Sequence, residues 1–433
     1  ASVAMGLQAG NDNQRISCVA IGELAGHIDQ GIISGFLTDE GYSVAVGYQA
    51  GYELQRGNCV AIGDQAGFYN QGFGAEGGYA VAIGYQAGYT GQSKRTVAIG
   101  AESGKNGQND YAVAIGSQAG RDSQGYEAVA VGVRAGRVNQ QDQSTAIGPD
   151  AGNQNQGTVA VAVGNQAGRF NQGDRAIAIG NNAGELTQGV ESIAIGGDAG
   201  LLRQGIRSVA LGFVAGRSTQ GDNSVAIGFD SGHQSQGFGS IAIGASSGYT
   251  FQGFQSTAIG QWAGSETQGE NAVTIGHESG QVRQGPYSVA MGYQAGQYQQ
   301  GNFFSVSYAV AVGANSGQTN QGLYAVAIGN YAGGITQADS AIAIGQNAGQ
   351  TLQGTRAIAI GMNAGASTQG VDAIAIGTNA GADPQSTNAI AIGTNSAQTN
   401  QGVGAVAMGT SAGANNQSAG GVSIGLNAGS LNQ

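Results

Sequence analysis

A repeat of 16 residues runs through the chain and constrains its fold more than any other sequence feature. Its motif is Ser/Ala-Val/Ile-Ala-Ile-Gly-x-x-Ala/Ser-Gly-x-x-x-Gln-Gly, and 26 copies follow one another, marked by a glycine from Gly6 to Gly425. Of the 25 spacings between marker glycines, 22 are 16 residues long. A fixed short period is typical of a solenoid, in which each repeat forms one coil and stacks on its neighbours.

The residues before each marker glycine predict a short β-strand. Val or Ile stands three positions before the marker in 24 copies, Ala two positions before it in 24, and Ile, Val, Leu or Met directly before it in all 26. Residues at spacing two share one face of a strand, so the aliphatic side chains would line one face and the small residues the other. We expect the aliphatic face to fill the coil and the small residues to form an outward strip.

Two columns after the marker predict the rest of the coil. A glycine stands four positions after the marker in 25 copies, with Ala397 as the exception, which predicts a positive φ or a close backbone approach at a corner. Glutamine stands eight positions after the marker in every copy. Stacked coils would bring these amides about 4.8 Å apart, where each can donate to the next amide or to a turn carbonyl. A surface glutamine that merely suits a turn is the alternative.

The structural amide ladder predicted in this way includes the following residues: Gln14, Gln30, Gln172, Gln188, Gln204, Gln220 and Gln433.

The repeat predicts an all-β fold, a parallel β-solenoid of 26 coils of 16 residues, in which residues 1–433 form a single uncapped solenoid. Three insertions interrupt it, within residues 32–41, 73–78 and 302–307. They would protrude from one edge as candidate contact loops, or else pack against a neighbouring subunit. Their apolar side chains are Phe36, Leu37, Phe73, Phe303 and Phe304.

Composition argues against catalysis and against several kinds of ligand. Only 9% of the residues are charged and 3 are histidine, so few groups could act as bases or metal ligands, and we expect no enzyme, cofactor or metal site. A net charge of -11 disfavours nucleic acid as a partner. Apolar runs such as 128–133 are too short to insert into a membrane. The glycine-rich stretch 72–77 lies in an insertion with no helix after it, which argues against a dinucleotide site.

Cysteine positions follow from the same register. Cys18 and Cys59 both stand four positions before a marker, in the second and fourth coils, which places them about 9.6 Å apart. That separation exceeds the reach of a disulfide. We therefore expect free thiols, or bonding between chains of an assembly.

Self-association is expected because the strand Ala-Ile-Ala-Ile-Gly is apolar on both faces, and strands of that kind are covered on both sides. An apolar strip that runs along the coils would form a larger exposed patch than monomers tolerate. We infer a parallel homo-oligomer with closed symmetry.

Segments such as 208–212, 224–228 and 288–292, each followed by Ala or Ser three residues after its glycine, resemble the head repeat of YadA-like trimeric autotransporter adhesins. The resemblance implies a left-handed parallel β-roll, a homotrimer, and surface attachment to host matrix or to a cell-surface receptor. The coil here is longer than that family's, and its Gln-Gly half is not part of the family motif. Similar repeats also resemble those of viral fibre proteins.

The predicted function is therefore that of a non-enzymatic extracellular fibre segment, on a cell or virion surface, that presents a long rigid surface for adhesion. A structural filament that stacks end to end is a competing prediction. An ice-binding solenoid is disfavoured because no threonine column exists.

Overall fold

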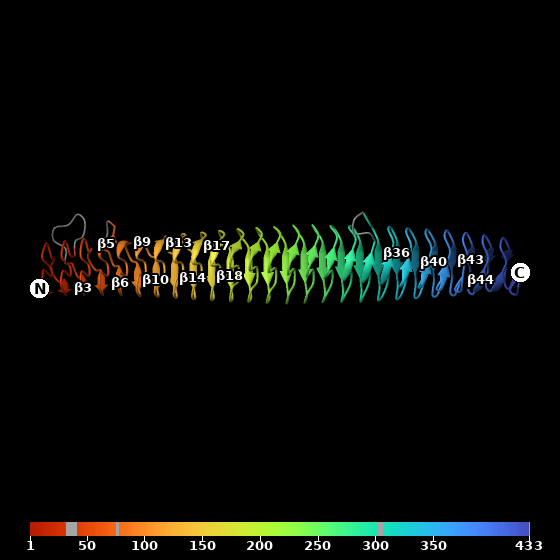
Figure 1. The fold of residues 1–433 in the computed structure, drawn as a ribbon, viewed down its shortest axis with the longest axis horizontal. Helices are drawn as coiled ribbons and strands as arrows, with labels where there is room; N and C mark the ends of the chain where they lie inside the picture. The colour runs from red at the N-terminus through yellow and green to blue at the C-terminus, as the bar shows by residue number, and fades with distance from the viewer. Residues whose placement is uncertain (32–40, 75–77, 302–305, 433) are drawn as a thin grey trace. The chain divides into compact units, whose positions relative to one another are not determined.

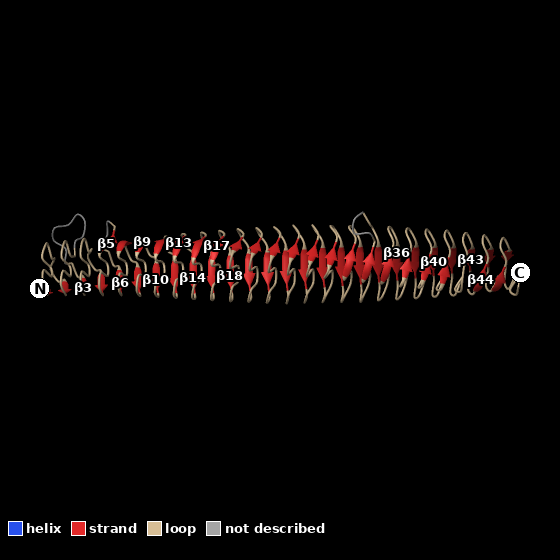
Figure 2. Cartoon of the chain, in the orientation of Figure 1, coloured by secondary structure: helices blue, strands red, loops and turns tan. Residues whose placement is uncertain are grey.

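The computed structural model describes residues 1–31, 41–74, 78–301 and 306–432. The chain divides into two units, Ala1–Ser218 and Thr219–Gln433, and each has the same local architecture. The described residues form short strands joined by turns, without a helix (Figures 1 and 2). The predicted all-β parallel β-solenoid is therefore confirmed within each unit. The continuity of one solenoid over residues 1–433 stays a prediction.

The first sheet of each unit consists of the strands that precede the marker glycines, and consecutive coils pair in parallel. The register matches the repeat, because Val113, Ala114 and Ile115 pair with the residues 16 positions later, Val129, Ala130 and Val131. In unit 1 its strands are β1 (Val3–Met5), β2 (Val19–Ile21), β3 (Val44–Val46), β4 (Val60–Ile62), β6 (Val81–Ile83), β8 (Val97–Ile99), β10 (Val113–Ile115), β12 (Val129–Val131), β14 (Thr145–Ile147), β16 (Val161–Val163), β18 (Ile177–Ile179), β20 (Ile193–Ile195) and β22 (Val209–Leu211). In unit 2 they are β24 (Val225–Ile227), β26 (Ile241–Ile243), β28 (Thr257–Ile259), β30 (Val273–Ile275), β32 (Val289–Met291), β34 (Val310–Val312), β36 (Val326–Ile328), β38 (Ile342–Ile344), β40 (Ile358–Ile360), β42 (Ile374–Ile376), β43 (Ile390–Ile392), β45 (Val406–Met408) and β47 (Val422–Ile424).

The second sheet carries the glutamine column, and its strands also pair in parallel, for example Gln353 with Gln369. In unit 1 its strands are β5 (Tyr69–Phe73), β7 (Thr90–Ser93), β9 (Asn106–Gln108), β11 (Asp122–Gln124), β13 (Val138–Gln140), β15 (Gln154–Gln156), β17 (Phe170–Gln172), β19 (Thr187–Gln188) and β21 (Arg203–Gln204). In unit 2 they are β23 (Thr219–Gln220), β25 (Ser235–Gln236), β27 (Phe251–Gln252), β29 (Thr267–Gln268), β31 (Val282–Gln284), β33 (Tyr298–Gln300), β35 (Thr319–Gln321), β37 (Thr336–Gln337), β39 (Leu352–Gln353), β41 (Thr368–Gln369), β44 (Thr399–Gln401) and β46 (Asn415–Gln417). Isolated bridges such as Gln369 with Gln385 continue this sheet where a strand is too short to be assigned.

The prediction of which strand face lines the interior is wrong. The central alanine of the first-sheet strands is fully buried, as at Ala114 and Ala359, and so is the alanine three positions after the marker, as at Ala364. The aliphatic residues on either side point outward, so that Ile115 is 38% exposed and Ile360 is 36% exposed. The interior has room only for small side chains because the glutamine of the second sheet extends across it and bonds to the backbone of the first sheet.

Glycine is required at both ends of the first corner. The marker Gly361 has φ +126°, and a Cβ there would lie 2.7 Å from the carbonyl oxygen of Gly377 in the next coil. Gly365, four positions later, has φ +51°. The prediction of positive φ or close approach at this corner is confirmed. At the exceptional position, Ala397 adopts the same left-handed conformation with φ 40°, which an L-residue with a Cβ rarely does.

Candidate functional site

Inside each coil, a buried glutamine amide joins the two sheets. Gln369, on β41, is 2% exposed. Its Nε2 donates to the carbonyl oxygen of Ile358 at 2.7 Å and to that of Ala373 at 3.2 Å, so that it links β40 to the turn that precedes β42. It also donates to Oε1 of Gln385 in the next coil at 3.1 Å. A buried amide satisfied in this way fixes the separation of the sheets.

The glutamine and corner-glycine columns depend on each other. A Cβ on Gly365 would lie 3.0 Å from both Cδ and Oε1 of Gln369, because the amide packs directly against the glycine backbone. The same contact recurs at Gly184 with Gln188, where a Cβ would lie 2.8 Å from Oε1. The two sequence columns are therefore a single packing unit.

At the start of the chain, the predicted ladder residues bond amide to amide. Gln14 is half-buried, and its Nε2 donates to Oε1 of Gln30 at 3.1 Å. Gln30 is fully buried and donates in turn to Oε1 of Gln55 at 3.1 Å. The same bonding continues in unit 2 from Gln321 to Gln417.

In the middle of the chain, the column stays buried and in register, and its amides bond to main-chain carbonyls, as they also do elsewhere. Gln172 pairs with Gln188, and Gln188 with Gln204. Each donates to two backbone carbonyls, as Gln172 does to Val161 at 2.8 Å and to Ala176 at 3.2 Å. Gln220 is 3% exposed and donates to Ser224. Gln433 lies outside the described residues.

A second amide column, which the sequence analysis missed, lines the first corner two positions after the marker. In unit 2, Asn347, Asn363, Asn379 and Asn395 form a chain in which each Nδ2 donates to the next Oδ1 at 3.0 Å. All four adopt φ between 54° and 56°, a conformation that asparagine tolerates better than most residues. The signal was present in the sequence as a recurring asparagine at this position.

The outward face of the first sheet is apolar along each unit. We call it the aliphatic stripe, and it comprises the first and third residues of every first-sheet strand. Exposed fractions of its members include 38% at Ile179 in unit 1, and 37% at Ile344 and 36% at Ile376 in unit 2. These side chains repeat in register from coil to coil, so that the stripe is an apolar surface apart from Thr145 and Thr257.

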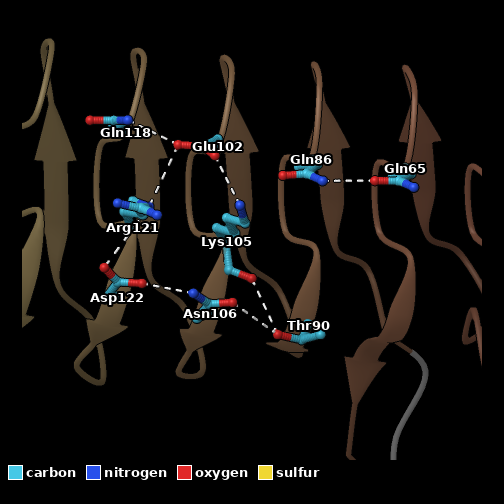
Figure 3. A network of polar contacts seen from close by, with 9 residues as sticks. All are labelled: Gln65, Gln86, Thr90, Glu102, Lys105, Asn106, Gln118, Arg121 and Asp122. Atoms are coloured by element: carbon cyan, nitrogen blue, oxygen red, sulfur yellow. Dashed lines mark hydrogen bonds and ion pairs between the residues drawn. The ribbon is translucent and has the colours of Figure 1, made fainter.

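The surface of unit 1 also carries polar networks that join successive coils (Figure 3). Lys105 Nζ lies 2.9 Å from Glu102 Oε1, and Gln118 Nε2 donates to Glu102 Oε2 at 2.9 Å. These donors hold the pKa of the Glu102 carboxyl below its usual value, with the hydrogen bond from Lys105 as the largest cause. Arg121 lies 3.6 Å from Glu102 and 3.9 Å from Asp122. Such a network favours the stacking register without forming a reactive centre.

The predicted contact loops are described only in part. Phe73, at the end of β5, is 58% exposed. Phe36, Leu37, Phe303 and Phe304 lie outside the described residues. Their role in contact stays a prediction.

Both cysteines are buried and form no disulfide with each other, as the register predicts, while bonding between chains stays untested. Burial raises the pKa of the Cys59 thiol to about 12, and it raises that of Cys18 as well. A thiol that is buried inside its own coil is poorly placed to bond to another chain.

Other chemistry is sparse in the parts of the chain that the structure describes. No cluster of three or more metal-ligating side chains occurs there. His27 stacks on Tyr52 with ring centroids 5.1 Å apart, and His277 stacks on Tyr293 at 5.5 Å. Within the same residues, no helix has the length and apolarity that a membrane crossing needs.

A depression of about 550 Å³ in unit 2 was also missed by the sequence analysis. Trp262, Tyr249 and Glu266 line it, together with small hydroxyl residues. The available signal was the single tryptophan of the chain, which is 44% exposed.

Comparison with known families identifies the repeat. Residues 218–231 and 369–396 match the family model described as the YadA head domain repeat, in two copies. The second segment contains β42 and β43 together with the buried Gln385. No curated protein matches the chain significantly. The chain therefore carries the YadA head domain repeat, at residues 218–231 and 369–396.

Proposed function

We propose that the chain is a segment of an extracellular surface fibre that associates with copies of itself and attaches to host matrix or to other cells. The aliphatic stripe is the observation that carries this proposal. The family whose model matches is a structural adhesin domain and not an enzyme family, which supports a role in attachment rather than catalysis.

The stripe supports self-association because of its extent and regularity. Exposed apolar patches on monomers rarely exceed a few hundred square ångströms, and larger ones mark interaction sites. In unit 2, Ile344, Ile360 and Ile376 are each more than a third exposed and lie in successive coils of one sheet. A partner with the same coil spacing would match this surface over its whole length, and a second copy of the chain has that spacing.

Three copies in parallel are the assembly that we propose. Closed cyclic symmetry would turn the stripe of each copy toward a common axis and cover all of them at once. The face that associates is then the Val/Ile face, not the small-residue face that the sequence analysis favoured. The amide column lies within each coil and takes no part in the contact.

Native mass spectrometry and light scattering on the full chain test the assembly. We expect a mass of three chains. We expect Ile344→Glu combined with Ile376→Glu to shift the mass toward one chain, because the carboxylates would face the apolar partner surface. The matched control is Leu352→Glu combined with Thr368→Glu on the second sheet, where Leu352 is 48% exposed, and it should leave the mass unchanged. A wild-type monomer at micromolar concentration would refute the association.

Attachment is tested separately with fluorescent beads coated with the chain. We expect the coated beads to be retained on decellularised matrix or on cultured epithelial cells above the level of beads coated with albumin. Equal retention of both would refute attachment. Electron micrographs that show fibres of indefinite length would instead favour the structural filament.

A further inference from the structure

The depression in unit 2 arises where small residues interrupt two outward columns of the solenoid. Two positions after the marker, Ser246 lies between Asp230 and Trp262 of the neighbouring coils. Five positions after the marker, Ser265 follows Tyr249. The two small side chains leave a hollow of about 550 Å³, within the range of sites that bind small molecules.

The walls of the hollow combine an aromatic face with many neutral polar groups. Trp262 is 44% exposed and contributes its indole, and Tyr249 adds a second ring. The hydroxyls of Thr250 and Thr267 and the amide of Gln281 also line the hollow. Tryptophan and tyrosine offer an apolar surface with a polar edge, which suits a ligand that has both C–H faces and hydroxyl groups.

The carboxylates favour an extended neutral ligand over a compact cation. Asp230 and Glu266 lie two coils apart, which corresponds to about 9.6 Å along the stack of coils. They therefore act as hydrogen-bond acceptors at separate ends of the hollow and do not converge on one charge. Asp230 Oδ1 also lies 3.2 Å from His233 Nδ1 of its own coil.

We propose that this hollow binds a carbohydrate, with one sugar ring lying against Trp262 and its hydroxyl groups bonded to the carboxylates and the neutral polar side chains. None of the lining residues belongs to the aliphatic stripe, so the hollow stays open when the stripe is covered. The inference extends the proposed attachment by naming a ligand class. The assembly test above does not depend on it.

Tryptophan fluorescence tests the proposal directly, because Trp262 is the single tryptophan of the chain and reports on this hollow alone. The full chain is titrated with lactose, maltose and cellobiose, and with choline chloride as a cationic probe. We expect a saturable change in emission with at least one disaccharide, at millimolar concentration, and none with choline. A response to choline alone, or to none of the four probes, overturns the proposal.

Substitution of Ser246 locates the binding. Ser246→Tyr fills the hollow and keeps Trp262 as the reporter, and the column accepts tyrosine because Tyr331 occupies it with φ 54°. The matched control is Ser411→Tyr, at the same column position in a distant coil. We expect Ser246→Tyr to weaken disaccharide binding at least tenfold, and Ser411→Tyr to bind as the wild type does. Equal disaccharide binding by the two variants overturns the assignment of the binding site to this hollow. The native mass of Ser246→Tyr is a separate control, and an unchanged mass shows that the assembly persists.

Discussion

Replacing Gln369 by leucine tests the amide column. The two N–H groups of its Nε2 are shared among three acceptors, at 2.7, 3.2 and 3.1 Å, and Oε1 accepts from Gln353 at 3.1 Å, so the change removes two donated hydrogen bonds and one accepted one. At about 1 kcal/mol net for each bond, the loss is about 3 kcal/mol. The larger apolar side chain recovers about 1–2 kcal/mol through burial, so the expected net destabilisation is about 1–2 kcal/mol.

Hydrogen exchange measures this loss locally, which matters because long repeat arrays do not unfold in a single step. Amides in peptides that span residues 353–385 should exchange roughly 5- to 30-fold faster than in the wild type, as about 1.4 kcal/mol corresponds to a factor of ten. The control is Thr368→Leu, an exposed neighbour on the same strand, with an effect below about 0.5 kcal/mol. Wild-type exchange rates in Gln369→Leu would refute the structural role of the column.

Gln369→Glu adds a dependence on pH to the same test. The introduced carboxylate would face the carbonyl oxygens of Ile358 and Ala373 in place of a donor. Burial and these acceptors should raise its pKa above the unfolded value of about 4.3. The variant should then exchange nearly as slowly as the wild type at pH 4 and lose protection as the pH rises toward 7. Protection that does not vary with pH would contradict the buried position of this side chain.

Three further predictions concern the corners and the thiols. Gly361→Ala should destabilise its coil by about 2–4 kcal/mol in local hydrogen exchange, because its Cβ would lie 2.7 Å from the Gly377 oxygen at φ +126°. Ala397→Gly should stabilise its coil by about 0.5 kcal/mol through relief of the left-handed strain. Gly381→Ala should destabilise its coil by more than this, because its Cβ would also lie 2.9 Å from Cδ and Oε1 of Gln385. Ala397→Gly with the stability of the wild type would refute the strain. Iodoacetamide at pH 8 should alkylate Cys18 and Cys59 only after denaturation. The free energy of unfolding that the neutral Cys59 thiol contributes should persist below pH 9.0 and be lost as the pH rises through about 12. Rapid alkylation of both thiols in the folded chain would contradict their burial.

The period, the parallel register and the corner glycines could be predicted from the sequence, because each is a constraint on the backbone that recurs in every coil. The glycine column, for example, combines a positive φ at Gly365 and its equivalents with a close approach of the glutamine amide that leaves no room for a Cβ. The placement of Cys18 and Cys59 two coils apart follows from the same register.

The direction of the strand faces could not be predicted from the strand alone, since both faces are apolar. What decides it is the length of the glutamine side chain on the opposite strand, which leaves space only for small side chains, as between Gln369 and Ala359. The hollow at Trp262 was missed for a different reason. The hollow exists because Ser246 and Ser265 are smaller than the residues at the same positions in neighbouring coils, and this difference matters only once the coils are stacked in space.

The interior of alanine and glutamine makes neighbouring coils interchangeable. Because each coil offers the next one nearly the same buried surface, a coil can be gained or lost by recombination within the gene without any new contact having to evolve. The number of coils in a unit can thus change in steps of one repeat. Pairing shifted by one coil would satisfy the interior equally well, so the surface pairs that differ between coils, such as Arg356 with Asp372 at 2.7 Å, distinguish the native alignment from its neighbours.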